Sequence, residues 1–200
     1  MKLAIIGQPG VGKTTFAHIL EFQYPNQIVL VPDKLDLLNK DLIPEAKNIS
    51  GHKSYQKALF YFQRELEELV CSNAEKKLVV CDGSALDVLN SWPDSIESFF
   101  DEVRSTLKKE LDRYDWVLQI SSINEENETH DNQLLDQKNF WIQHPRYLSI
   151  TKDKEFNLCA KKISNILSQI IRKVPHKEIM ASINKDFCMY QPKIENQIHP

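Results

Sequence analysis

The sequence has few of the features that mark zinc proteins, secreted disulfide scaffolds or membrane proteins. Its four cysteines lie far apart and never form a C-x-x-C pair, so neither a zinc site nor a disulfide framework is indicated. No apolar run at the amino terminus is long enough for a signal peptide or a membrane span, because the run there covers only residues 3–6. We therefore predict a cytoplasmic protein in a reducing compartment that binds no membrane.

A strong charge of either sign is also lacking. The formal net charge is -3 and the pI is near 6.1, so no basic field indicates nucleic-acid binding. Hydrophobic residues at 42% and charged residues at 26% are ordinary for a globular protein, and 200 residues suffice for one core. We predict one domain over residues 1–175, followed by a helical or irregular extension over residues 176–200.

Short apolar runs alternate along the chain with longer amphipathic stretches, a pattern typical of an α/β protein with a parallel sheet. The predicted strands are residues 3–6, 28–31, 78–81, 116–120 and 147–150. The predicted helices are residues 14–21, 35–39, 53–73, 84–91, 95–112, 134–143 and 155–174, with a further one after Pro175. Because proline disfavours the α conformation of the residue before it, a break is expected at Trp92-Pro93.

The most specific feature is the segment Gly7-Gln8-Pro9-Gly10-Val11-Gly12-Lys13-Thr14, which fits the P-loop pattern G-x-x-x-x-G-K-[ST] between a predicted strand and a predicted helix. Glycines let backbone N–H groups approach phosphate oxygens, and the helix points its positive dipole end at the same anion. Lys13 can reach the β- and γ-phosphates, and Thr14 can offer its hydroxyl to Mg²⁺. The sequence thus predicts a P-loop NTPase that binds ATP and Mg²⁺ through Gly7, Gly10, Val11, Gly12, Lys13, Thr14 and Thr15.

A magnesium site of this kind also needs a carboxylate at the end of another strand. Asp82 follows the apolar run 78–81, which is the Walker B form, and it is the predicted metal-side carboxylate, acting directly or through water. The alternative is an aspartate that only caps the next turn.

Asp33 ends the second predicted strand in Val31-Pro32-Asp33. Ligands of open α/β sheets bind outside the carboxyl ends of the strands, so its carboxylate could accept the proton of an attacking hydroxyl. A solvated loop aspartate or a helix cap is the alternative.

At these positions the sequence resembles the small P-loop ATPases related to the nicotinamide riboside kinase domain, which belong with the thymidylate and deoxynucleoside kinases. The likeness rests on residues 7–15, on Val31-Pro32-Asp33, where such proteins usually show V-P-E, and on residues 79–87. The last block looks like the family's strand followed by D-R-x-x-x-D, and Phe62-Gln63-Arg64-Glu65 is similar to its helical glutamine and glutamate positions. The resemblance covers roughly residues 1–175.

The resemblance implies a five-stranded parallel sheet of order 2-3-1-4-5 and transfer of the ATP γ-phosphoryl group to a nucleoside or other small hydroxyl compound. It makes Asp33 a base or substrate anchor, Asp82 a magnesium or catalytic carboxylate and Asp87 a substrate-side residue. By the same resemblance Gln63 and Arg64 could reach a nucleobase or phosphate. The alternative for Gln63, Arg64 and Asp87 is a plain polar role on a helix surface.

The sequence departs from the family in its positive charges. Gly83 stands where the family has arginine, and residues 121–145 contain no arginine and only Lys138. Kinases of this group close a lid whose arginines neutralise charge on the transferred phosphoryl group. Arg146, just beyond this acidic segment, is the predicted catalytic replacement.

These departures keep a second function open, an ATP-dependent switch or scaffold with weak or no kinase turnover. A GTPase is not indicated, because no N-K-x-D motif follows the fourth strand. A third possibility is an interaction module that would use Trp92, Trp141 and the aromatics within residues 55–62. Aromatics at helical spacing are typical of a core, and we expect these to be core.

Overall fold

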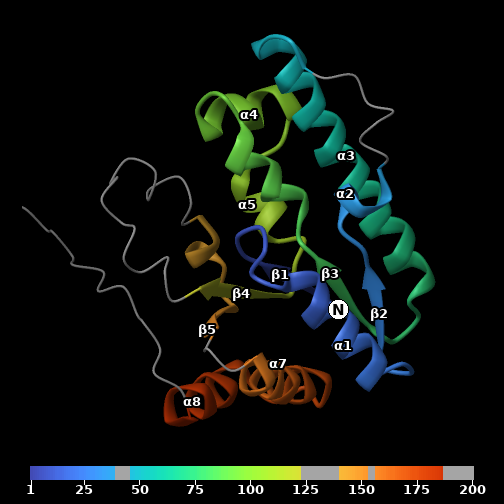
Figure 1. Ribbon diagram of the computed structural model, residues 1–200, viewed down its shortest axis with the longest axis vertical. Helices are drawn as coiled ribbons and strands as arrows, with labels where there is room; N and C mark the ends of the chain where they lie inside the picture. Colours follow the sequence, from blue (N-terminus) through green and yellow to red (C-terminus); the bar gives the residue numbers. More distant parts are fainter. Residues whose placement is uncertain (39–45, 123–139, 153–155, 187–200) are drawn as a thin grey trace, which may run out of the picture.

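In a computed structural model of the chain, the structure describes residues 1–38, 46–122, 140–152 and 156–186 (Figure 1). The strands are β1 (Lys2–Ile6), β2 (Ile28–Val31), β3 (Leu78–Asp82), β4 (Trp116–Ser122) and β5 (Tyr147–Lys152). They form one five-stranded sheet of order β2-β3-β1-β4-β5, and every neighbouring pair is parallel. The predicted α/β class and strand order are confirmed.

Helices cover both faces of this sheet, as crossover connections between parallel strands require. One face carries α1 (Lys13–Gln23), α7 (Phe156–Ile171) and α8 (His176–Asp186) (Figure 1). The other face carries α3 (Ile49–Asn73), α4 (Ile96–Val103) and α5 (Leu107–Leu111). The shorter elements are α2 (Lys34–Leu37) and the 3₁₀ helices η2 (Ala85–Ser91) and η4 (Phe140–Gln143).

The two layers have separate cores because side chains of a strand alternate between the faces of the sheet. In β1, Leu3 and Ile5 join the core beneath α1 and α7, whereas Ala4 and Ile6 join the core beneath α3 and α4. Ile179 of α8 belongs to the first of these cores and is fully buried. Helix α8 is therefore packed into the same body as the sheet.

The core beneath α3 and α4 is rich in aromatic rings. Phe99 meets Phe60 and Trp92 edge to face, with ring centroids 5.2 and 5.0 Å apart, and Trp141 is also buried. The expectation of core is wrong for Tyr61 and Phe62, which are 43% and 37% exposed. They lie off the buried stripe of α3, which passes through Gln56, Leu59, Phe60, Gln63 and Glu67.

Helix boundaries differ from those predicted where local capping decides them. Helix α3 begins four residues earlier than predicted, at Ile49, because the Asn48 side chain accepts a 2.8 Å hydrogen bond from the N–H of Gly51. The predicted helix over 95–112 is split in two, since Arg104 adopts a left-handed conformation with φ 52° and Thr106 caps α5. Of the helix predicted over 134–143, only residues 140–143 fall within the described part. Among the described residues, no helix has the length and apolarity needed to cross a membrane.

A buried charge pair joins α3 to the sheet at the amino ends of the strands. Glu67 is fully buried, and it accepts hydrogen bonds from Lys2 Nζ at 2.9 Å and from the Tyr114 hydroxyl at 2.8 Å. Arg113 lies 3.6 Å from the same carboxylate. Buried charges are tolerated only when they are paired. This carboxylate therefore fixes α3 against β1 and against the residues that precede β4.

We expect Glu67→Gln to lower the free energy of unfolding by about 3 kcal/mol, because it removes the buried counter-charge 2.9 Å from the Lys2 ammonium and leaves only the exposed Glu68 at 3.9 Å. Urea unfolding measures the difference. The matched control is Glu68→Gln on the same helix, which also contacts Arg113 but has a side chain that is 58% exposed. A loss below about 0.5 kcal/mol is expected there. Equal losses in both variants would contradict the assignment of Glu67 as the buried partner.

Candidate functional site

The P-loop connects β1 to α1 at the carboxyl edge of the sheet, and its glycines adopt conformations that other residues rarely reach. Gly12 has φ 100° at the N-cap position of α1, and no side chain caps the helix there. At Gly7, φ is 148° and a Cβ would lie 2.2 Å from the carbonyl oxygen of Ile120 on β4. The loop is therefore held against the sheet while the first amide groups of α1 remain available to an anion.

The Lys13 ammonium lies over this loop. It donates hydrogen bonds to the carbonyl oxygens of Gly7 at 2.8 Å and Gln8 at 3.2 Å. Thr14 and Thr15 follow on the exposed first turn of α1. Val11 is buried in the core, so only its backbone can face a ligand, and its N–H donates to the Gln8 carbonyl at 3.3 Å. The loop thus brings together an ammonium, two hydroxyls and backbone groups, the set that binds polyphosphate.

Asp82 ends β3 beside this loop and is 2% exposed. Burial raises the pKa of its carboxyl above the ordinary value, as does the charge of Asp33, whereas a hydrogen bond from Thr14 and the charge of Lys13 lower it. Its Oδ1 has no hydrogen-bond partner among the described residues. A buried carboxylate oxygen without a partner, next to a threonine hydroxyl, fits the ligand set of a hard cation.

Asp33 follows β2 and lies at the same carboxyl edge of the sheet, near Gly83; we call the backbone around Gly83, with the Asp33 and Asp87 carboxylates, the rim of the site. Its Oδ1 caps α2 by accepting a 2.7 Å hydrogen bond from the N–H of Leu35. Its Oδ2 faces Gly83, where a Cβ would lie 3.0 Å away. One oxygen of Asp33 thus caps a helix, as the alternative interpretation expected, and the other lies near Gly83.

Asp87 also lies close to Gly83. Both of its oxygens accept hydrogen bonds from Ser84, from the N–H at 2.9 Å and from the hydroxyl at 2.7 Å, as in a capping box. The Lys34 ammonium lies 4.0 Å from Asp87 and donates to the Ser84 carbonyl at 3.1 Å. A Cβ at position 83 would be 2.7 Å from Asp87 Oδ2. Because Gly83 also has φ 84°, any side chain there would be strained and its Cβ would crowd the Asp87 and Asp33 carboxylates, so the backbone favours glycine.

Two of the predicted substrate residues are engaged elsewhere. Gln63 is fully buried, and its Oε1 accepts a 3.1 Å hydrogen bond from the N–H of Lys34. Its Nε2 has no partner among the described residues. Arg64 pairs with Glu110 of α5 at 3.3 Å and lies over the Phe60 ring, so the structure does not bring it to the P-loop. Gln63 instead supports the segment that carries Asp33.

The prediction that Arg146 replaces the lid arginines is wrong in this structure. Arg146 directly precedes β5, and its carbonyl accepts a 3.1 Å hydrogen bond from the N–H of Val117 at the start of β4. Its guanidinium lies over the Trp116 ring, 5.5 Å from the centroid. Because β4 and β5 are parallel, both residues lie at the amino edge of the sheet, opposite the P-loop.

The sequence reasoning missed two lysines at the carboxyl edge. Lys34, directly after Asp33, is 3% exposed and lies behind the loop that carries Gly83. Lys152 is the last residue of β5, and its ammonium is 3.3 Å from the Val11 carbonyl of the P-loop. The predicted strand ended at Ile150, two residues too early to place Lys152 at this edge. Only the observed length of β5 places Lys152 there.

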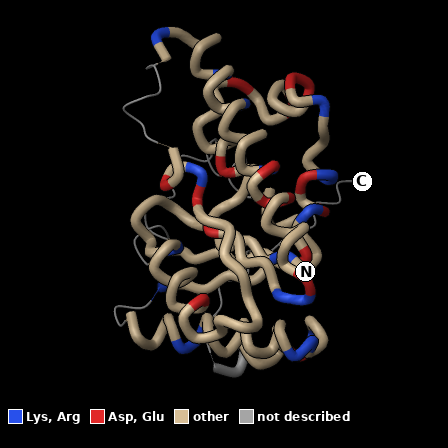
Figure 2. The backbone as a smooth tube through the Cα atoms, turned by 90° about the vertical axis from the view of Figure 1, so that its right-hand side faces the viewer, with Lys and Arg blue, Asp and Glu red and all other residues tan. Residues whose placement is uncertain are grey.

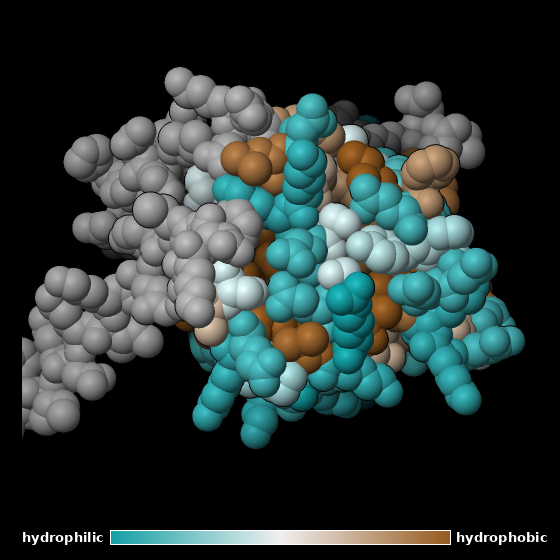
Figure 3. Space-filling model, turned by 90° about the horizontal axis from the view of Figure 1, so that it is seen from below, coloured by the Kyte–Doolittle hydropathy of each residue, from teal (hydrophilic) through white to brown (hydrophobic). Residues whose placement is uncertain are grey.

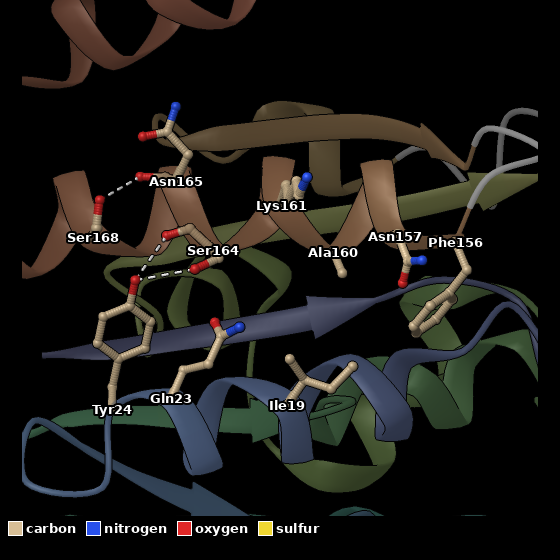
Figure 4. A pocket seen from close by; sticks show the side chains of 10 residues that line it. All are labelled: Ile19, Gln23, Tyr24, Phe156, Asn157, Ala160, Lys161, Ser164, Asn165 and Ser168. Carbon is tan, nitrogen blue, oxygen red and sulfur yellow. Dashed lines mark hydrogen bonds between the residues drawn. The ribbon is translucent and has the colours of Figure 1, made fainter.

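Two hollows of the described part lie along α1, and one of them begins at Thr14 and Thr15 of the P-loop. A groove of about 550 Å³ runs between α1 and α7, and Figure 4 shows it lined by amide, hydroxyl and apolar side chains. Tyr24 and Ser164 share a 3.0 Å hydrogen bond across it. Seen from below, hydrophilic residues separate the apolar patches of this face (Figure 3). Charged segments of both signs also interleave along the chain (Figure 2). The charged groups at the P-loop are therefore not part of a larger region of one sign.

Comparison with known proteins finds a likeness of structure but not of sequence. No family model matches the chain, and no curated protein matches its sequence. The solved structure of thymidylate kinase from Ehrlichia chaffeensis matches with a TM-score of 0.52 at 19% identity, covering 84% of this chain and 98% of that one. The chain has the fold of a thymidylate kinase. Deoxyadenosine kinase from M. mycoides with bound dATP also matches, with a TM-score of 0.45 at 15% identity over 84% of this chain and all of that one.

Asp82 gives a pH-dependent prediction for the protein without ligands. A carboxyl whose folded-state pKa is raised binds its proton more tightly when folded, so stability falls as pH rises from about the ordinary value of 3.8 to the raised value. We expect Asp82→Asn to raise the melting temperature at pH 7, with a difference that shrinks towards pH 4. Thermal unfolding across this range measures it. The exposed Asp101→Asn is the control, and an Asp82→Asn difference independent of pH would contradict the prediction.

Gly83 gives a prediction about the rim. Gly83→Ala places a Cβ at φ 84° against both carboxylates and is expected to lower the free energy of unfolding by roughly 1–3 kcal/mol. Gly51→Ala is the matched control, because Gly51 lies in the first turn of α3 with no contact closer than 3.4 Å. That change should be neutral or stabilise by up to about 1 kcal/mol. An unchanged free energy of unfolding in Gly83→Ala would show that the Asp33 and Asp87 carboxylates do not crowd this position.

Proposed function

We propose that this chain binds ATP with Mg²⁺ at the P-loop and transfers the γ-phosphoryl group to a small hydroxyl compound of the nucleoside type. The observation that carries the proposal is the uncapped start of α1, together with Lys13 and the neighbouring Thr14 and Asp82. Amide groups, an ammonium and a helix dipole directed at one place form a site for several phosphate charges. The shared thymidylate kinase fold supports a phosphoryl acceptor beside that site.

The proposed reaction is an in-line displacement at the γ-phosphorus. The acceptor oxygen forms a bond to phosphorus, the bond from phosphorus to the β-γ bridging oxygen breaks, and ADP leaves. The hydroxyl proton passes to a carboxylate, and Asp33 Oδ2 is the candidate because Asp33 Oδ1 is held by the cap of α2. Catalysis then consists mainly of positioning and charge stabilisation.

Thr14 and Asp82 are the residues that would hold magnesium. Within the described part of the chain no group of three or more His, Cys, Asp or Glu side chains could hold a metal ion by itself. This agrees with Mg²⁺, which is usually bound by one or two protein groups together with substrate phosphates and waters. When bound, Mg²⁺ neutralises charge on the β- and γ-phosphates.

A specific observation favours the alternative of an ATP-dependent switch with little turnover. Arg64 and Arg146 are both engaged away from the P-loop, and Gly83 stands where the resemblance to the kinases implies an arginine. One positive group at the transferred phosphoryl can change the rate by factors of about 10³ to 10⁵. A switch would respond to ATP through different contacts in two conformations, without an acceptor. A reducing cytosol remains the predicted compartment for either function.

Lys13→Ala tests the proposal. We expect it to weaken Mg²⁺-ATP binding, measured by calorimetry, by about a hundredfold, and to abolish ATP consumption, because it removes the ammonium that contacts the β- and γ-phosphates. ATP consumption by the unaltered protein is measured against nucleosides, nicotinamide riboside and short polyols.

Lys161→Ala is the matched control, because Lys161 is a lysine of the α1 and α7 groove, away from the P-loop. Stimulation by at least one acceptor supports the kinase. ATP binding without stimulation by any acceptor favours the switch. Absence of Mg²⁺-ATP binding in the unaltered protein would end both proposals.

A further inference from the structure

The end of β5 contacts the P-loop through the side chain of Lys152. Lys152 Nζ is 3.3 Å from the Val11 carbonyl oxygen, and these residues are 141 positions apart in the sequence. A Cβ on Gly12 would lie 3.9 Å from the same ammonium. Phe156, at the start of α7, stacks on Phe16 of α1 with ring centroids 4.8 Å apart. Strand β5 and helix α7 thus brace the loop with one charged and one aromatic contact.

Lys152 brings a positive charge to the P-loop. Among the described residues, no carboxylate forms an ion pair with it. Its side chain is half-buried against the loop. A positive charge held in a partly desolvated position stabilises an anion bound nearby.

The contact acts on the peptide unit that joins Val11 to Gly12. The Val11 carbonyl and the Gly12 N–H belong to the same planar group, and in a trans peptide they point in opposite directions. An ammonium on the carbonyl polarises this group and makes the N–H a stronger donor. Gly12 is the N-cap residue of α1, so its N–H belongs to the phosphate cradle.

From this geometry we infer that Lys152 is a positioning residue of the nucleotide site, which strengthens polyphosphate binding through the Val11–Gly12 peptide. The inference rests on the proposed function. It supplies a second ammonium at the P-loop beside Lys13, from an element that the sequence alone did not place there. Its effect is expected to grow with the number of phosphates on the ligand.

Lys152→Met tests this inference, because methionine keeps most of the aliphatic stem and removes the charge. We expect Mg²⁺-ATP to bind about tenfold more weakly, as for the loss of one charge-assisted hydrogen bond. Adenosine, which lacks phosphates, should bind with unchanged affinity. Lys152→Arg should keep ATP affinity within about threefold, because it keeps the positive donor. Lys161→Met serves as the control, and the salt dependence of ATP binding should become weaker in Lys152→Met.

The outcomes separate this inference from the proposed function. If the unaltered protein binds no Mg²⁺-ATP, the proposed function fails and the inference fails with it. If it binds Mg²⁺-ATP and Lys152→Met binds equally well, only the role of Lys152 is overturned. Equal weakening of ATP and adenosine binding in Lys152→Met, with no rescue by Lys152→Arg, would show a merely structural role and would also overturn the inference.

Discussion

Amide groups at the start of α1 have no side-chain cap, because the residue in the capping position is Gly12. Orphan N–H groups at a helix start must find partners in water or in a ligand, and the helix dipole favours a negative one. Lys13 adds a full positive charge at the same place, and its present partners are two loop carbonyls. Anion binding at this turn therefore satisfies both the orphan amides and the ammonium.

The same constraint explains a carboxylate that would otherwise be unfavourable. Asp82 is buried next to a site built for negative charge, and burial and Asp33 both raise its pKa. Phosphates would raise it further unless a cation were bound between them and the carboxylate. A buried acid retained at the expense of stability is typical of a functional position. The P-loop and Asp82 are consequently the two parts of the site at which we propose that an anion and a cation bind together.

Much of this arrangement is local in sequence and could be predicted. The P-loop pattern carries its own backbone geometry, and each short apolar run became a strand of the sheet. Parallel strands end at the same edge of the sheet, so Asp33 after β2 and Asp82 at the end of β3 were correctly expected to lie at one edge. The same rule applied to Arg146 would have excluded it, because a residue that precedes a strand lies at the amino edge.

The remaining site residues depend on contacts between distant segments, and these were not visible in the sequence. Gln63 is held by the N–H of Lys34, 29 positions away, and Lys152 reaches the loop across 141 positions. Neither residue type nor spacing distinguishes such lysines and glutamines from surface ones. The exposure of Tyr61 and Phe62 has a similar origin, since only the partners of α3 decide where its buried stripe begins.

The buried network at the amino edge also reaches the site. The Tyr114 hydroxyl donates to Glu67 and accepts a 3.1 Å hydrogen bond from the N–H of Ala85, the first residue of η2. This bond fixes the turn that contains Gly83 and Ser84, and Ser84 in turn holds Asp87. The charge pair between Lys2 and Glu67 orients the tyrosine, because it occupies the other oxygen of the carboxylate. Interactions that stabilise the fold at one edge of the sheet thereby set the position of an acidic side chain at the other.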